Sequence, residues 1–160
     1  SYPVRSVYFR LSSATVDVET SDFSGLTVYH RILMPLTSSI TLTHQHQEVL
    51  LKPFQSYFFD GGDPVSSLGT CQDFNLIYKP SYQGHMSAIS PKESVKSQSR
   101  YQLIYALCPL TLEWETNHSQ TLQTHELLVI EQASPLQEMT ITFLPHQSGE
   151  QPIAIWTGLQ

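Results

Sequence analysis

The amino-acid sequence predicts an all-β fold, built as a sandwich or barrel of short strands. Apolar residues mostly recur at every second position, which is the period of a half-buried strand. Gly and Pro residues interrupt the chain repeatedly, and the 10 prolines leave few intervals long enough for a helix. A hydrophobic content of 40% over 160 residues suits one folded domain, or two small halves that share a core.

The expected strands carry β-branched or aromatic residues between polar ones. The best helix candidate is residues 122–132, but Leu127 to Ile130 is a short continuous apolar run that fits a strand equally well. The other expected strands lie, in chain order, at residues 4–9, 11–18, 40–43, 56–59, 74–78, 110–114 and 139–143.

A weak internal repeat indicates two copies of one strand-rich unit. At an offset of 71 residues, Ile32-Leu33 falls on Leu103-Ile104, and Tyr57-Phe58-Phe59 falls on Leu128-Val129-Ile130. Apolar positions keep their register while surface residues differ, as a duplication predicts. Sequences rich in strands also share such patterns by chance, so chance is the competing explanation.

The repeat suggests how the chain is divided. We expect a first lobe at residues 1–80 and a second lobe at residues 100–160, with N-terminal strands available to complete the second. Between them, residues 81–99 are polar and Ser-rich, and we expect a solvated linker there. The two lobes are expected to form one compact unit.

The charge distribution argues against a nucleic-acid partner. The formal net charge is −6, and a DNA or RNA binder needs clustered cations, of which the chain shows no stripe. No apolar run approaches the roughly 20 residues of a membrane-spanning helix, and no signal peptide is visible. We therefore expect a cytoplasmic protein with no membrane partner, in which Cys71 and Cys108 are reduced, packed thiols.

Four stretches of the first half resemble motifs of the HutD/Ves family, in the same order and with similar spacing. Family members usually also carry a Trp-x-Asn-Gly-Gly-Gly-type segment near the N-terminus, and nothing like it precedes Val7. The four stretches are the Phe-Arg-Leu-Ser strand at 9–16, Phe23-Ser24-Gly25 with Arg31-Ile32-Leu33, the Pro-Phe to Gly-Gly-Asp-Pro-Val stretch at 51–65, and Asp73-Phe74-Asn75 within 71–77.

The resemblance implies a cupin-like double-stranded β-helix in two related β-barrel lobes, a bicupin. It also implies a cytoplasmic protein associated with bacterial histidine utilisation, without a settled enzymatic activity. Such proteins are regarded as binders of small molecules, plausibly of a histidine-breakdown intermediate that bears carboxylates.

Four residues are candidates for binding that anion. Arg10 and Arg31 belong to the most family-like strands, and a guanidinium inside a barrel suits bidentate binding of a carboxylate. Asp73 and Asn75 flank Phe74, so on a strand both point to one face. The alternatives are an internal salt bridge from Asp73 to one of the arginines, and a structural hydrogen-bond network that braces the barrel.

Two further motifs have simpler interpretations. The segment 60–64, Asp-Gly-Gly-Asp-Pro, is most simply a turn. His44 and His46 resemble the His-x-His of metal-binding cupins, but Glu48 follows too closely, and residues 45–48 suit a hairpin tip. We expect no metal and no other cofactor. No Gly-x-Ser-x-Gly motif, triad context or phosphate-binding loop is present.

Three functional hypotheses follow. The first is a non-enzymatic protein with a regulatory role that holds a small anionic metabolite, such as formylglutamate or urocanate, through Arg31 and Arg10. The second is a metal-dependent cupin enzyme that uses His44 and His46. The third is a structural or stress-related protein whose function is an interface, and a homodimer is open in each case.

Overall fold

The computed structural model describes residues 9–12, 17–19, 29–69, 71–133 and 136–160, and every regular element in these ranges is a β-strand. All strand pairs are antiparallel. The predicted all-β class is therefore confirmed. No described segment forms a helix with the length and apolar character needed to cross a bilayer.

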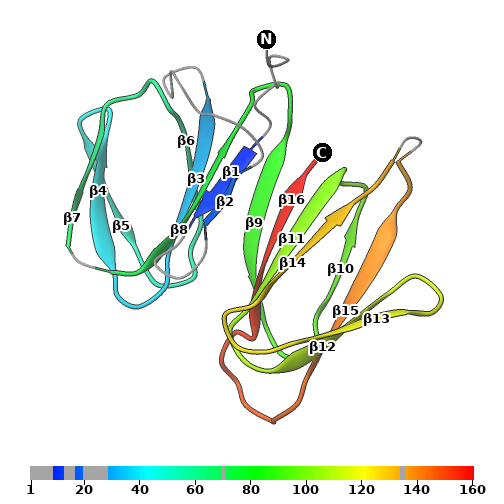
Figure 1. Cartoon of the computed structure of the whole chain (residues 1–160). Helices are drawn as coiled ribbons and strands as arrows, with labels where there is room; N and C mark the ends of the chain where they lie inside the picture. Colours follow the sequence, from blue (N-terminus) through cyan, green and yellow to red (C-terminus); the bar gives the residue numbers. More distant parts are fainter. Residues whose placement is uncertain (1–8, 13–16, 20–28, 70, 134–135) are drawn as a thin grey trace. The chain divides into compact units, whose positions relative to one another are not determined.

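The chain divides into two compact units, Ser1–Tyr82 and Gln83–Gln160. In the first unit, a five-stranded sheet has the order β2-β1-β8-β3-β6, and a three-stranded sheet has the order β5-β4-β7 (Figure 1). Its strands are β1 (Phe9–Ser12), β2 (Asp17–Glu19), β3 (His30–Pro35), β4 (Ile40–His44), β5 (Gln47–Leu51), β6 (Tyr57–Asp60), β7 (Val65–Leu68) and β8 (Asp73–Tyr78).

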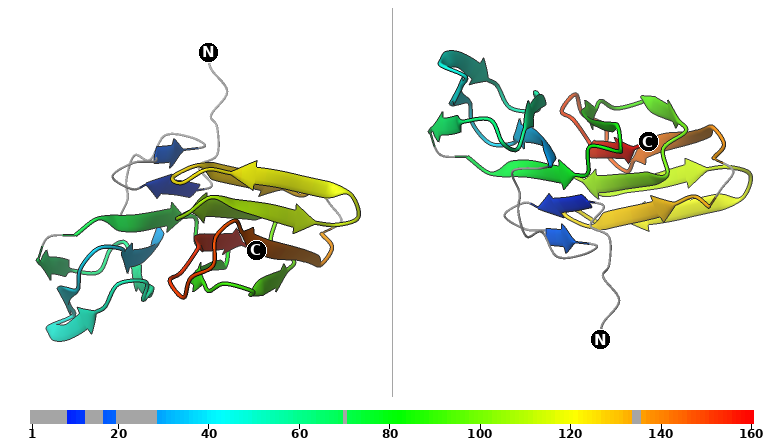
Figure 2. Two further views of the ribbon diagram at one scale, coloured as in Figure 1. Left: turned by 90° about the horizontal axis from the view of Figure 1, so that it is seen from below. Right: turned by 90° about the horizontal axis from the view of Figure 1, so that it is seen from above.

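The second unit consists of two four-stranded sheets, with the orders β14-β11-β16-β9 and β10-β15-β12-β13. Figure 2 shows their strands, coloured from green to red, from two further directions. The strands are β9 (Gly84–Ile89), β10 (Ser94–Ser97), β11 (Tyr101–Ala106), β12 (Leu110–Trp114), β13 (His118–Leu122), β14 (Leu127–Glu131), β15 (Met139–Pro145) and β16 (Ala154–Leu159).

The two units repeat the same strand order. The series β6-β3-β8-β1 in the first unit corresponds to β14-β11-β16-β9 in the second, and β5-β4-β7 corresponds to β13-β12-β15. Strands β3 and β11 begin 71 residues apart, as do β5 and β13, which is the offset seen in the sequence. The units differ at one edge, because β2 pairs with β1 whereas β10 pairs with β15.

The structure differs from the sequence-based expectation for the predicted linker and leaves a strand at the ambiguous segment. The predicted linker 81–99 is not a linker, because it contains β9, which pairs with β16, and β10, which pairs with β15. Both are edge strands, where polar side chains can face water, and this explains why their Ser-rich composition resembled a solvated connection. The ambiguous segment 122–132 contains no helix: Leu122 ends β13, and residues 127–131 form the strand β14. Residues 4–8 and 13–16 of the expected N-terminal strands lie outside the described residues.

The interiors of the two units differ in content. A cluster of twelve buried side chains, including Ile104, Phe143 and Trp156, fills the space between the sheets of the second unit. The corresponding cluster in the described part of the first unit has five members: Leu33, Ile40, Leu42, Leu51 and Phe59. Other apolar residues of the first unit, such as Phe9, Leu11, Phe74 and Leu76, are buried as well.

Candidate functional site

A hollow of about 360 Å³ lies between the two sheets of the first unit. One wall comes from β3, β6 and β8, and the other comes from β4, β7 and the turn before β7. The apolar part of the lining includes Leu33 and Phe59, whereas six polar side chains give the hollow its chemistry. They are Arg31, Asp63, Ser66, Ser67, Asp73 and Asn75.

Strand register places Arg31 on the inner face of the larger sheet. It lies opposite Ile77 of β8 on one side and Phe59 of β6 on the other. The neighbouring His30, Ile32 and their partners point to the opposite face, because side chains alternate along a strand. The guanidinium carbon of Arg31 lies 5.1 Å from the centroid of the Phe59 ring, within cation–π range.

A short hydrogen-bond chain fixes one end of the guanidinium. Arg31 Nη2 donates to Asn75 Oδ1 at 3.2 Å, and Asn75 Nδ2 donates to Asp73 Oδ2 at 3.2 Å. Asn75 thus links Arg31 to Asp73. A direct salt bridge from Asp73 to an arginine was one of the alternatives left open by the sequence. Phe74 points the other way and is fully buried.

The Arg31 guanidinium keeps unused donor capacity. Its Nε is buried and has no hydrogen-bond partner among the described residues. Burial lowers the pKa of Arg31, and the nearby Asp73 carboxylate raises it by a smaller amount. A buried N–H without a partner is costly, so the Arg31 side chain has an unmet donor beside the hollow.

Arg10 lies on the same sheet but does not belong to the lining of the hollow. It is half-buried on β1 and also pairs with Ile77, on the side away from Arg31. Of the four residues predicted to bind a ligand, the structure therefore brings together Arg31, Asp73 and Asn75. Arg10 is separated from Arg31 by the strand β8.

A second polar group lies on the opposite wall. His44, near the end of β4, is hydrogen-bonded through both ring nitrogens: Nδ1 lies 2.7 Å from Tyr57 Oη and Nε2 lies 2.8 Å from Asp63 Oδ2. The imidazole also packs edge-on against the Tyr57 ring, with centroids 5.7 Å apart. The contacts of Asp63 and Tyr57 with His44 were not predicted from the sequence, because they span 19 and 13 residues.

The structure does not bring His46 to His44. His46 is exposed in the turn between β4 and β5, with φ of 65°, and both nitrogens of His44 are already hydrogen-bonded. No group of three or more His, Cys, Asp or Glu side chains is placed to hold a metal ion in the described parts of the chain.

The second unit fills the corresponding space with side chains. Gln102 and Trp156 occupy the positions that match Arg31 and Asn75, since they are the second residue of β11 and the third of β16. Trp156 Nε1 donates to the buried Gln102 Oε1 at 2.8 Å. The indole lies over Gly158, where a Cβ would meet its ring atoms at 2.6 Å. A neutral, filled interior thus replaces the charged hollow of the first unit.

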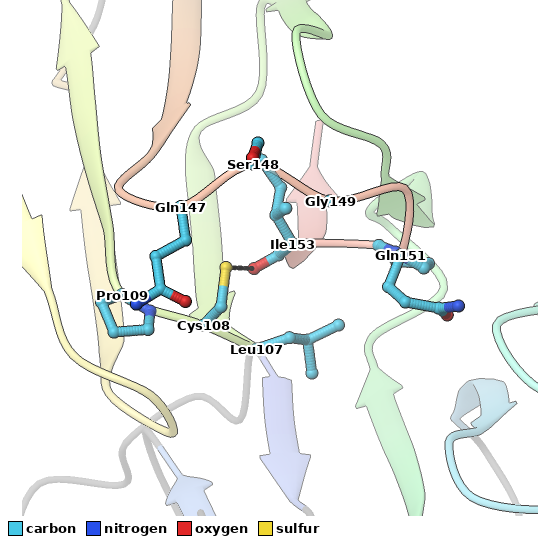
Figure 3. A pocket seen from close by; sticks show the side chains of 9 residues that line it. Leu107, Cys108, Pro109, Gln147, Ser148, Gly149, Gln151 and Ile153 are labelled. Carbon is cyan, nitrogen blue, oxygen red and sulfur yellow. Dashed lines mark hydrogen bonds between the residues drawn. The ribbon is translucent and has the colours of Figure 1, made fainter.

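A smaller hollow of about 210 Å³ lies elsewhere in the second unit, between the β11–β12 and β15–β16 connections (Figure 3). The Cys108 thiol points toward the carbonyl oxygen of Ile153 at 3.9 Å, and burial raises the pKa of this thiol. None of the lining residues is charged. This hollow therefore lacks the groups that would bind an anion.

Comparisons with known proteins agree with the fold. The sequence model of the HutD family matches residues 4–147. Among solved structures, HutD from Pseudomonas fluorescens SBW25 (formate condition) is 21% identical with a TM-score of 0.66, over 95% of this chain and 78% of that one. A conserved protein of unknown function from Pseudomonas aeruginosa PAO1 is 21% identical with a TM-score of 0.71, over 86% and 75%.

A third similar structure is AerE from Microcystis aeruginosa, which is 13% identical with a TM-score of 0.57, over 83% of this chain and 78% of that one. No curated protein matches the chain. At these identities the likeness to solved structures concerns the fold alone.

Proposed function

The chain belongs to the HutD family, and we propose on that premise that it binds a small carboxylate metabolite in the hollow of its first unit. The observation that carries the proposal is the half-buried Arg31 side chain in the lining of the hollow, whose buried Nε has no partner among the described residues. Asn75 holds the guanidinium in place, and Asp73 supports Asn75. Such an arrangement is preorganised for an acid, because the protein does not have to order a mobile cation on binding.

We also infer that each unit is a cupin-like double-stranded β-helix, so that the chain is a bicupin. The support is the strand order β6-β3-β8-β1 opposite β5-β4-β7, which is that of a jelly roll, and its recurrence in the second unit. In this interpretation a duplication produced two lobes, of which the first retains a hollow and the second is packed. Urocanate and formylglutamate are the candidate ligands that the family resemblance supplies, together with a regulatory role in the cytoplasm.

The proposal is tested by titration calorimetry with a panel of small carboxylates that includes urocanate and formylglutamate. We expect saturable binding to the wild-type chain. Arg31→Gln should weaken binding by roughly ten- to a hundredfold, the usual effect of losing a hydrogen bond from a charged donor.

A matched control is Arg100→Gln, which removes a half-exposed arginine from the second unit. It should leave carboxylate affinity unchanged. Circular dichroism should show that both variants keep the β-fold. Equal affinity of Arg31→Gln and wild type for every acid that binds would contradict the proposal, as would the absence of binding by any of them.

A further inference from the structure

The charges around the hollow do not suit a ligand that is only an anion. One cation, Arg31, and two carboxylates, Asp63 and Asp73, line it. Asp73 already acts on Arg31 through Asn75 and by its charge. A plain carboxylate would meet Arg31 but would offer no donor to the Asp63 carboxylate on the opposite wall, and it would add a further negative charge to the hollow.

The hydrogen bonds of His44 fix the orientation of Asp63. A carboxylate only accepts, so His44 Nε2 carries the hydrogen and donates to Asp63 Oδ2. In the neutral ring, Nδ1 then accepts from the Tyr57 hydroxyl. The side chain of His44 is 15% exposed and that of Asp63 is 23% exposed, so both are held near the edge of the hollow rather than free in water.

This arrangement leaves one oxygen of Asp63 available. Oδ2 is occupied by His44, whereas Oδ1 has no hydrogen-bond partner among the described residues. Asp63 itself is anchored by the turn, because its backbone N–H donates to the Asp60 carbonyl at 3.0 Å. A fixed acceptor therefore lies across the hollow from a fixed donor.

We propose that Asp63, positioned by His44 and Tyr57, selects ligands that carry an ammonium or other N–H donor in addition to the carboxylate bound by Arg31. This inference rests on the proposed function and narrows its ligand class to bipolar acids. Each charged group of the ligand then meets an opposite charge: the ligand carboxylate meets the guanidinium, and the ligand nitrogen meets Asp63. Tyr57 and His44 are positioning residues in this scheme, and Asp63 is the group that contacts the ligand.

The test uses pairs of acids that differ only in a terminal amine. Propionate is compared with β-alanine, butyrate with 4-aminobutyrate, and valerate with 5-aminovalerate, by titration calorimetry on the full chain. The series also measures the distance from Arg31 to Asp63, because the chain length with the largest gain in affinity from the amine is the one that spans it. At that length the amine should tighten binding at least about tenfold over the plain acid.

Three variants assign the effect. Asp63→Asn should remove the preference for the amine while plain acids bind at least as tightly as before, because Arg31 is untouched and one negative charge is removed from the hollow. His44→Gln should reduce the preference partly by releasing Asp63. Asp73→Asn is the matched control and should keep the preference.

The outcomes separate this inference from the function on which it rests. Plain acids that bind through Arg31 with no advantage for any amine would overturn the inference and leave the proposed function intact. A preference that Asp73→Asn abolishes and Asp63→Asn retains would overturn it too. If no acid of either kind binds, both proposals fail.

Discussion

At the scale of single residues, the site depends on one position at which the two units carry different side chains. Arg31 and Gln102 occupy matching positions on β3 and β11. Gln102 has its carbonyl oxygen paired to Trp156 and its amide nitrogen placed 3.6 Å from the Met139 sulfur. Arg31 instead donates from Nη2 to Asn75, and its buried Nε has no partner among the described residues. The neutral Gln102 can be paired fully within the core, whereas the charged Arg31 is stabilised by an anionic group from outside the chain.

The two thiols should be unreactive in the folded chain. Burial raises the pKa of both Cys71 and Cys108, and the Asp73 carboxylate adds to the effect at Cys71. We expect slower reaction with a disulfide reagent at pH 8 in the native protein than in urea, because the thiolate is the nucleophile. Rates as fast in the native state as in urea would contradict this expectation.

The same shift predicts how stability depends on pH. A raised thiol pKa means that the folded state holds the proton more tightly than the unfolded state does. This contribution to the free energy of unfolding is present below the unfolded thiol pKa and is lost as pH rises through the folded value. Urea unfolding of wild type and of Cys108→Ser between pH 7 and pH 10 measures it, and the wild type should lose more stability over that range.

Three of the four candidate ligand residues could be located from sequence because they belong to local strand patterns. Asp73 and Asn75 share a face by simple alternation, and Arg31 is a charged residue on a strand with apolar neighbours. Arg10 follows the same pattern yet does not line the hollow, since alternation gives the face of a sheet but not the position across it. The link from His44 to Asp63 could not be predicted, because it depends on the packing of the two sheets.

At the scale of elements, β16 shows how the second unit closes its interior. A Cβ added to Gly158 would lie only 2.6 Å from atoms of the Trp156 ring and from the Ser99 hydroxyl. Gly158→Ala should therefore force the buried indole to shift and lower the free energy of unfolding by about 1–3 kcal/mol. Gly149→Ala is the control, because nothing lies within 4 Å of the added Cβ there.

Urea unfolding followed by tryptophan fluorescence is the suitable measurement, since both tryptophans, Trp114 and Trp156, belong to the second unit. An unchanged midpoint for Gly158→Ala, or an equal loss in both variants, would show that the indole does not fill the interior as described.

Strands without apolar alternation were the elements that the sequence predicted least well. They include the central strands β11 and β16, in which every residue is buried and which were not among the expected strands. Strands β9 and β10 were expected as a linker because their exposed positions carry Ser, His and Lys. Strand β12, in contrast, was predicted with its observed bounds, Leu110–Trp114, because its alternating apolar residues are buried. Apolar alternation reveals strands with a buried face, and it weakens at an edge, where the partner strand supplies most of the stabilisation.

At the scale of the whole molecule, the two units should differ in local stability. The second has the larger described cluster of buried apolar side chains, and the first contains the hollow. Hydrogen exchange followed by mass spectrometry should show slower exchange in β11, β12, β15 and β16 than in β4, β5 and β7. A saturating carboxylate should slow exchange in the first unit alone. Faster exchange in the second unit, or protection confined to it, would contradict this picture.

The proposed function requires that Arg31 donates to the carboxylate of a ligand. NMR spectra of the arginine Nε–Hε groups, recorded during titration with a carboxylate that binds, measure this contact, with the Arg31 signal assigned from Arg31→Lys. We expect the Arg31 signal to move saturably with ligand while the Arg100 signal stays in place. A ligand that saturates the protein and leaves the Arg31 signal unmoved would contradict it.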